Sequence, residues 1–101
     1  MSEILPPEYQ DLYSKYFLQS PESFLKDAIV KELKKRLAQY TLTDFRLRKK
    51  YLMCFEEFRS RKIVEQLGYS YEVEQDYCDW EISCDGIITI HEEFAKLGIL
   101  E

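Results

Sequence analysis

The feature that most constrains this chain is a stretch from Glu22 to Leu67 that contains neither glycine nor proline. Mostly apolar side chains recur in this stretch at alternating steps of three and four residues, and Asp44 is the polar exception. The positions are Val30, Leu33, Leu37, Tyr40, Asp44, Leu47, Tyr51, Cys54 and Phe58. This heptad-like spacing predicts one long helix or a helix pair with a coiled-coil-like seam over 21–67. A break fits at 40–44 or at 51–54, and Phe55-Glu-Glu-Phe58 would then open a helix with acids in its first turn.

Capping residues give the expected ends of these helices. Ser20 can cap a helix that has Pro21 at its first position, and Gly68 can end it. Residues 68–75 are interpreted as an acidic, extended connector. A last helix is predicted over 76–98 with Gly98 as its C-terminal cap. Its seam repeats the same spacing at Trp80, Cys84, Ile87, His91 and Phe94.

The N-terminal region, residues 1–20, carries an aromatic stripe after Pro6-Pro7. The residues are Tyr9, Leu12, Tyr13, Tyr16 and Phe17. Their spacing of i, i+3, i+4, i+7 and i+8 predicts a short amphipathic helix. The stripe packs either on the core of the chain itself or on a partner.

The resulting prediction is an all-α chain, built as a long helical hairpin or a small bundle with a short N-terminal aromatic helix. A length of 101 residues fits a single helical domain. Three glycines and three prolines are few for a fold built on tight turns. The alternative is an α+β fold, because the β-branched run at Ile87–Ile90 favours a short strand after Gly86.

Charge is distributed unevenly along a chain whose formal net charge is −5. Residues 1–50 hold 10 Lys or Arg and 7 Asp or Glu, whereas residues 51–101 hold 4 and 12. No Lys or Arg occurs between Ile63 and Ala95. The two segments either attract each other within the chain or present separate charged surfaces. The basic 26–62 face could touch nucleic acid phosphates, although the acidic half would repel a polyanion.

The sequence contains no motif typical of a catalytic site or a metal site. The acidic residues of 72–85 lack the alternating Asp/Asn pattern and turn glycine of a calcium loop, and no nucleotide-binding or nucleophile motif occurs. We therefore predict no enzyme activity, no catalytic residue, no metal and no cofactor. The odd cysteine count, at Cys54, Cys78 and Cys84, argues against disulfides and favours the reducing cytoplasm. Neither a secretory signal nor a membrane span is visible in the sequence.

Two short blocks carry a family resemblance. They are Phe45-x-x-x-Lys49-Lys50-Tyr51 with Cys54-Phe55-Glu56-Glu57-Phe58, and Val73-Glu74-x-Asp76-Tyr77-x-Asp79-Trp80-Glu81. Over residues 30–97 the chain resembles small acidic helical proteins of archaea and cyanobacteria that carry KYGMSFEEF and EDDYxEWE patterns. Those proteins look like antitoxins encoded beside small ribonuclease-type toxins. The family offers no catalytic residues, and Leu52 stands where it has a glycine that would break the helix.

Charge and resemblance together predict a non-enzymatic, antitoxin-like interaction module that masks a basic partner, such as a small toxin. The predicted partner-binding residues are exposed carboxylates and two aromatic anchors: Glu72, Glu74, Asp76, Asp79 and Glu81, with Tyr77 and Trp80. Packing within the core is the alternative for both aromatic residues. A helical nucleic-acid-binding regulator that uses the 26–62 face is the alternative function, and a homo-oligomer is an open possibility.

Overall fold

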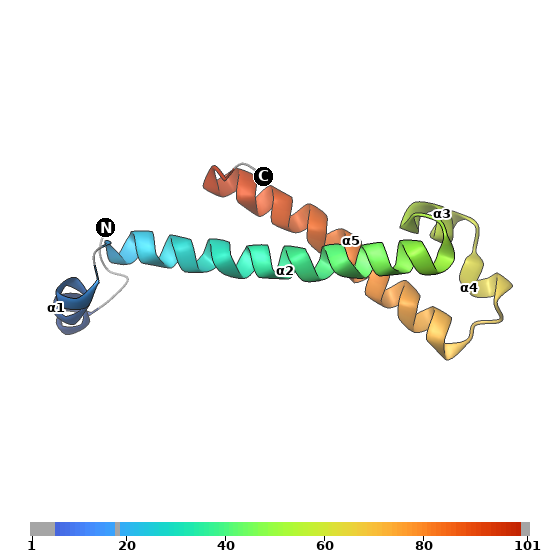
Figure 1. Cartoon of the computed structure of the whole chain (residues 1–101), viewed down its shortest axis with the longest axis horizontal. Helices are drawn as coiled ribbons and strands as arrows, with labels where there is room; N and C mark the ends of the chain where they lie inside the picture. Colours follow the sequence, from blue (N-terminus) through green and yellow to red (C-terminus); the bar gives the residue numbers. More distant parts are fainter. Residues whose placement is uncertain (1–5, 18, 100–101) are drawn as a thin grey trace. The chain divides into compact units, whose positions relative to one another are not determined.

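The computed structural model describes residues 6–17 and 19–99, and these residues form five α-helices and no strand (Figure 1). The all-α prediction is confirmed. The strand alternative at 87–90 is wrong, because these residues lie within helix α5, Tyr71–Leu97. The chain divides into two compact units, unit 1 at Met1–Lys34 and unit 2 at Lys35–Glu101. Helix α2, Pro21–Tyr51, contributes residues to both units.

Unit 1 consists of helix α1, Pro7–Tyr16, and the first part of α2. The predicted aromatic helix is therefore present. The Tyr13 ring stacks on Phe17 at 4.6 Å between centroids, and Phe24 meets both rings at 5.7 and 5.5 Å. As predicted, Ser20 caps α2, because its Oγ accepts the Ser23 N–H at 3.1 Å.

The described residues of unit 1 include no buried side chain. Helix α1 buries none of its residues, and the one residue that α2 buries, Leu47, belongs to unit 2. Tyr9 and Tyr16 are 56% and 72% exposed. The aromatic cluster of unit 1 therefore covers itself only in part and leaves much of its stripe in solvent.

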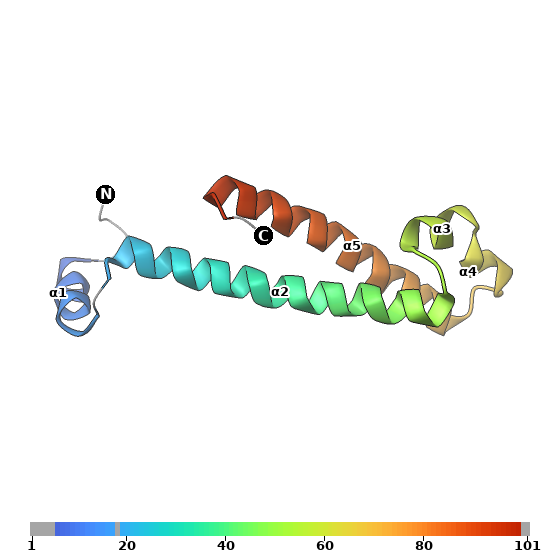
Figure 2. The same cartoon turned by 45° about the horizontal axis from the view of Figure 1, so that its top comes forward.

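Unit 2 contains the rest of α2, α3 at Phe55–Ser60, α4 at Ile63–Gln66, and α5. Helix α5 runs back along the 35–51 part of α2 (Figures 1 and 2). The core of unit 2 surrounds Trp80, whose ring lies 5.1 Å from Phe58, 5.5 Å from Phe55 and 6.0 Å from Tyr51 between centroids. The predicted seam is thus the inner face here, since Leu47 and Phe58 are fully buried.

Helix α2 ends at Tyr51 although no glycine follows it. Leu52 adopts φ 59°, in the left-handed region that L side chains disfavour. The missing glycine therefore does not prevent a sharp break. The turn at Leu52 reverses the chain so that Phe55 and Phe58 become buried against Trp80. The free energy of this packing outweighs the cost of the left-handed backbone at Leu52.

The variant Leu52→Gly is expected to raise the free energy of unfolding by about 0.5–1 kcal/mol, because it removes left-handed strain and loses little packing. The Leu52 side chain is 87% exposed. The matched control is Leu42→Gly, an exposed position inside α2, which is expected to lose about 1 kcal/mol. Urea denaturation of both variants measures whether each substitution raises or lowers the free energy of unfolding. A destabilised Leu52→Gly protein would contradict the strain argument.

The extended connector predicted for 68–75 is wrong in its second half. Helix α5 already begins at Tyr71, and Ser70 caps it by accepting the Val73 N–H at 3.3 Å. Gly68, at φ 77°, ends the preceding turn as predicted. In the first turn of α5, Val73 is the residue that is buried in the core.

Gly86 lies inside α5 for a packing reason. A Cβ at this position would lie 2.4 Å from Cε2 of Tyr40 and below 3.0 Å from two more atoms of that ring. The absent side chain therefore lets the Tyr40 ring of α2 rest on the backbone of α5. This close approach explains a mid-helix glycine that propensity alone disfavours.

The variant Gly86→Ala is expected to destabilise the protein by about 1–2 kcal/mol despite alanine's higher helix propensity, because the Tyr40 ring must move. In a Tyr40→Ala background the same change is expected to become stabilising by up to about 1 kcal/mol. Thermal or urea unfolding of the parent, the two single variants and the double variant measures the coupling free energy between positions 40 and 86. Equal effects of Gly86→Ala in both backgrounds would show that Tyr40 is not the obstacle.

Candidate functional site

Asp76 is buried, which corrects the prediction that it faces a partner. Its side-chain Oδ2 accepts hydrogen bonds from Lys50 Nζ and Tyr51 Oη, each at 2.6 Å. Lys50 also pairs with Glu72. The acidic and basic segments therefore neutralise each other at this point within the chain, and Asp76 is withdrawn from the predicted surface because it belongs to the contact between α2 and α5.

These contacts shift the pKa values of the groups involved. Burial by itself raises the pKa of Asp76, but the hydrogen bonds from Lys50 and Tyr51 and the Lys50 charge outweigh it and hold the pKa below its ordinary value. Burial, followed by the hydrogen bond to Asp76, raises the pKa of Tyr51 to about 12. Hydrogen bonds to Asp76 and Glu72 raise the pKa of Lys50.

We expect the stability of the protein to fall with acid through this cluster. A carboxyl group with a lowered folded-state pKa stabilises above its unfolded pKa of about 3.9, and this contribution is lost as the pH falls through the folded-state value. Asp76→Asn is expected to cost about 2 kcal/mol at pH 7 and to flatten the decline below about pH 5.

The control for this measurement is Glu74→Gln, an exposed carboxyl group on the same helix. Urea unfolding between pH 3 and pH 7 should give the control the same pH slope as the parent protein. An Asp76→Asn protein with the full acid dependence would assign that dependence to other groups.

Trp80 is fully buried, so it is a core residue and not an exposed partner anchor. Its indole Nε1–H donates to Asp44 Oδ1 at 2.8 Å, and Arg48 pairs with the same carboxylate at 3.0 Å. The polar break in the predicted seam thus has a physical reason, because the buried indole needs an acceptor. Tyr77 is half-buried against Phe55, at 5.3 Å between ring centroids.

A row of carboxylates remains on the outer face of α5, opposite the residues that face the core. It comprises Glu74, Glu81, Asp85 and Glu92, which we call the acidic stripe. Its spacings of 7, 4 and 7 residues, with Cys78 and Ile88 filling the gaps, keep it on one face over about 27 Å. Glu81 is half-buried, and the other three are exposed. Within the described part of the chain, no ion pair includes any of the four.

Two residues of the acidic stripe were absent from the predicted partner-binding set. Asp85 and Glu92 lie inside the helix predicted at 76–98, but they were missed because the prediction followed the density of acids along the chain and not their helical phase. Continuing the helical phase back to Tyr71 reveals the 7-4-7 spacing. Of the other predicted residues, Asp79 is half-buried, lies on a different face of α5 from the stripe and accepts a hydrogen bond from Gln75 at 3.1 Å.

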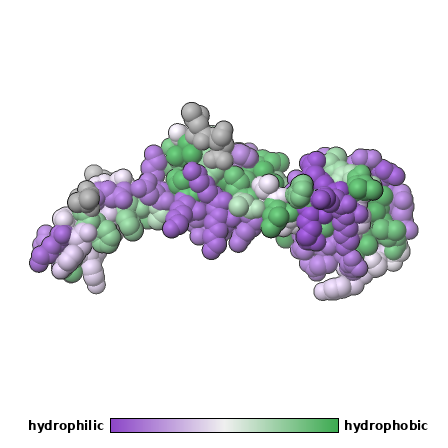
Figure 3. Space-filling model, in the orientation of Figure 1, coloured by the Kyte–Doolittle hydropathy of each residue, from purple (hydrophilic) through white to green (hydrophobic). Residues whose placement is uncertain are grey.

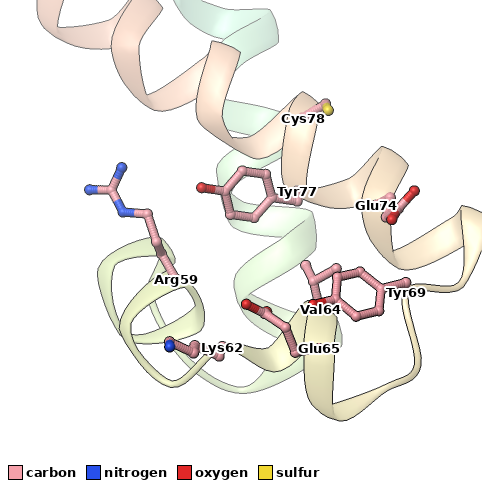
Figure 4. A pocket seen from close by; sticks show the side chains of 8 residues that line it. All are labelled: Arg59, Lys62, Val64, Glu65, Tyr69, Glu74, Tyr77 and Cys78. Atoms are coloured by element: carbon pink, nitrogen blue, oxygen red, sulfur yellow. The ribbon is translucent and has the colours of Figure 1, made fainter.

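An open groove of about 440 Å³ lies beside the N-terminal end of the acidic stripe (Figure 4). Tyr77 extends from α5 toward α3 and α4, while Arg59 and Lys62 stand on the opposite side. The lining residues are Arg59, Lys62, Val64, Glu65, Tyr69, Glu74, Tyr77 and Cys78. Glu74 and Cys78 belong to both the groove and the face of the stripe, so the two features are continuous.

The visible surface of the molecule is mixed in hydropathy. Figure 3 shows hydrophilic residues, in purple, next to hydrophobic ones, in green, over the visible surface. Ile82 and Ile88 are each 59% exposed on α5. The distinguishing property of the outer face of α5 is therefore its charge.

The described residues offer few groups for metal binding or catalysis. They contain no group of three or more His, Cys, Asp or Glu side chains placed to hold a metal ion. Cys54, Cys78 and Cys84 are free thiols. His91, predicted to continue the seam, is exposed, because Ile90 takes the buried position instead, while Phe94 is buried as the seam predicts. No helix in this part of the chain combines the length and apolar character needed to cross a membrane.

A scan against known protein families, a search of curated proteins and a search of solved structures found no match to this chain. The resemblance to antitoxin-like proteins therefore stays a prediction carried by its short motifs.

Proposed function

We propose that this protein is a non-enzymatic interaction module that masks a basic surface of a protein partner with the acidic stripe of α5. The observation that carries the proposal is the stripe itself: four carboxylates in line on one helix face, outside the ion pairs of the described chain. The resemblance adds the kind of partner, a small ribonuclease-type toxin whose RNA-binding surface would be basic. The three free thiols are consistent with action in the reducing cytoplasm.

Electrostatics favours a basic partner over a neutral one. No Lys or Arg lies between Ile63 and Ala95, and the nearby cations Arg59 and Lys62 line the groove at the Glu74 end of the stripe. A row of one sign on a rigid helix steers an oppositely charged partner toward it and raises the association rate. Because the spacing of 7, 4 and 7 reads the same in both directions, a basic helix with that spacing fits in either orientation.

The groove supplies what the stripe lacks, a place for an apolar anchor. Charged rows at the rim of an interface add specificity, whereas most binding free energy comes from side chains that fill pockets. Tyr77 and Val64 offer apolar surface there, and Glu74 joins the groove to the stripe. The partner we propose is therefore a basic segment with an apolar or aromatic side chain near one end.

The alternative function, nucleic-acid binding through the 26–62 face, is less well supported. Arg48, Lys50, Arg59 and Arg61 each pair with a carboxylate of the same chain. Fewer basic groups are then left to contact phosphates, and the acidic stripe of unit 2 repels a polyanion.

The test uses a synthetic helical peptide with Lys at 7-4-7 spacing and one Phe before the first Lys, and a scrambled peptide of equal composition. We expect the ordered peptide to bind at least about tenfold more tightly at low salt, and the difference to shrink as salt screens the charges. Neutralising the stripe with Glu74→Gln, Glu81→Gln, Asp85→Asn and Glu92→Gln is expected to abolish the preference. Fluorescence anisotropy measures both affinities.

The matched control neutralises four other carboxyl groups and so makes the same change in net charge: Glu22→Gln, Glu56→Gln, Glu57→Gln and Glu93→Gln. The preference for the ordered peptide should survive in this variant. Equal loss in both variants would reduce the effect to net charge and end the case for the stripe. Micromolar binding to a DNA or RNA duplex, lost in a Lys34→Glu/Lys35→Glu variant, would favour the alternative function.

A further inference from the structure

The aromatic stripe of α1 is an exposed apolar feature that the proposed function does not use. Its side chains line an open hollow of about 410 Å³ in unit 1. They are Tyr9, Leu12, Tyr13, Tyr16 and Phe17. Leu12 is 53% exposed and Phe17 is 48% exposed, and α1 buries none of its residues. A contiguous aromatic surface of this kind marks an interaction site.

The charged residues beside the aromatic stripe of α1 indicate which kind of surface covers that stripe. Glu8, Leu12 and Lys15 follow at steps of four and three residues, so they form one row along the edge of the aromatic face. Glu8 lies near one end of α1 and Lys15 near the other. Two copies of α1 packed antiparallel would place Glu8 of each copy opposite Lys15 of the other, and would also oppose their helix dipoles.

The aromatic residues have the same symmetry. Tyr9 and Tyr16 lie seven residues apart on one face, with Leu12 and Tyr13 between them. An antiparallel pair brings Tyr9 of one copy against Tyr16 of the other and places the apolar centre on the twofold axis. The face is therefore complementary to itself in shape, in apolar character and in charge, as an isologous interface requires.

We propose that α1 mediates self-association of this protein as an antiparallel pair centred near Leu12. The exposed area agrees with this occupant. The exposed parts of Tyr9, Leu12, Tyr16 and Phe17 amount to roughly 500–600 Å² per copy, so a pair buries at most about 1,000–1,200 Å² in total, at the low end of specific interfaces. This proposal is independent of the acidic stripe, which lies in unit 2.

The test reverses the two charges one at a time in the full chain. Glu8→Lys places lysines opposite one another in the pair, and Lys15→Glu places glutamates opposite one another. Each variant alone is expected to weaken dimerisation by about tenfold at low salt, because two attractions become two repulsions. An equimolar mixture of the two variants is expected to restore the dimer, since every contact is again between opposite charges. Sedimentation velocity over a concentration series measures each association.

The controls Glu65→Lys and Lys35→Glu make the same changes in net charge at exposed positions of unit 2 and should leave association unchanged. A second variant, Leu12→Glu, is expected to weaken the dimer by more than about a hundredfold. A parent protein that is monomeric at about 100 µM overturns the proposal. Two weakened single variants that fail to recover on mixing overturn the antiparallel pairing.

Discussion

The contact between Trp80 and Asp44 is the interaction on which unit 2 depends. The indole ring is fully buried among Tyr51, Phe55 and Phe58, and its N–H needs an acceptor inside that apolar environment. Asp44 provides this acceptor from α2, so the ring and the hydrogen bond together fix how α5 packs on the 35–51 part of α2. The short helix α3 then covers the ring with two phenylalanines, and α2 must end at Tyr51 so that the chain can turn toward them.

A second polar contact, one helical turn earlier on α5, divides the charges of the chain into two groups. Asp76 is buried against Lys50 and is not available to a partner, whereas Glu72 pairs with the same lysine but keeps its side chain largely exposed. Among the described residues, the carboxylates of the acidic stripe on the far side of the same helix form no ion pair. The division follows from helical phase, because positions three or four residues from Trp80 face α2 and those on the opposite side of α5 face solvent. Net charge per segment cannot distinguish the two groups.

Local signals in the sequence predict a helix end well where that end depends on its own capping residue. Ser20 and Gly98 cap the helices as expected, and the seam is the inner face at Leu47 and Phe58. The sequence fails where tertiary contacts decide. Leu52 takes a glycine-like conformation because Phe55 and Phe58, three and six residues later, must reach the core, and Gly86 makes room for the Tyr40 ring of another helix. The site was predicted only in part for the same reason, since the burial of Asp76 and Trp80 depends on which residues of α2 lie opposite.

The acidic stripe and the aromatic face of α1 differ in a way that assigns them different kinds of partner. Four carboxylates in a row repel the same row on a second copy, so the stripe is unsuited to self-association and suited to a basic protein. The α1 face carries Glu8 and Lys15 at equivalent distances from its centre, so a second copy meets attraction in place of repulsion. In a chain with a net charge of −5, self-association is least opposed where both signs occur together. That condition is met on α1, whereas the long run from Ile63 to Ala95 contains no Lys or Arg.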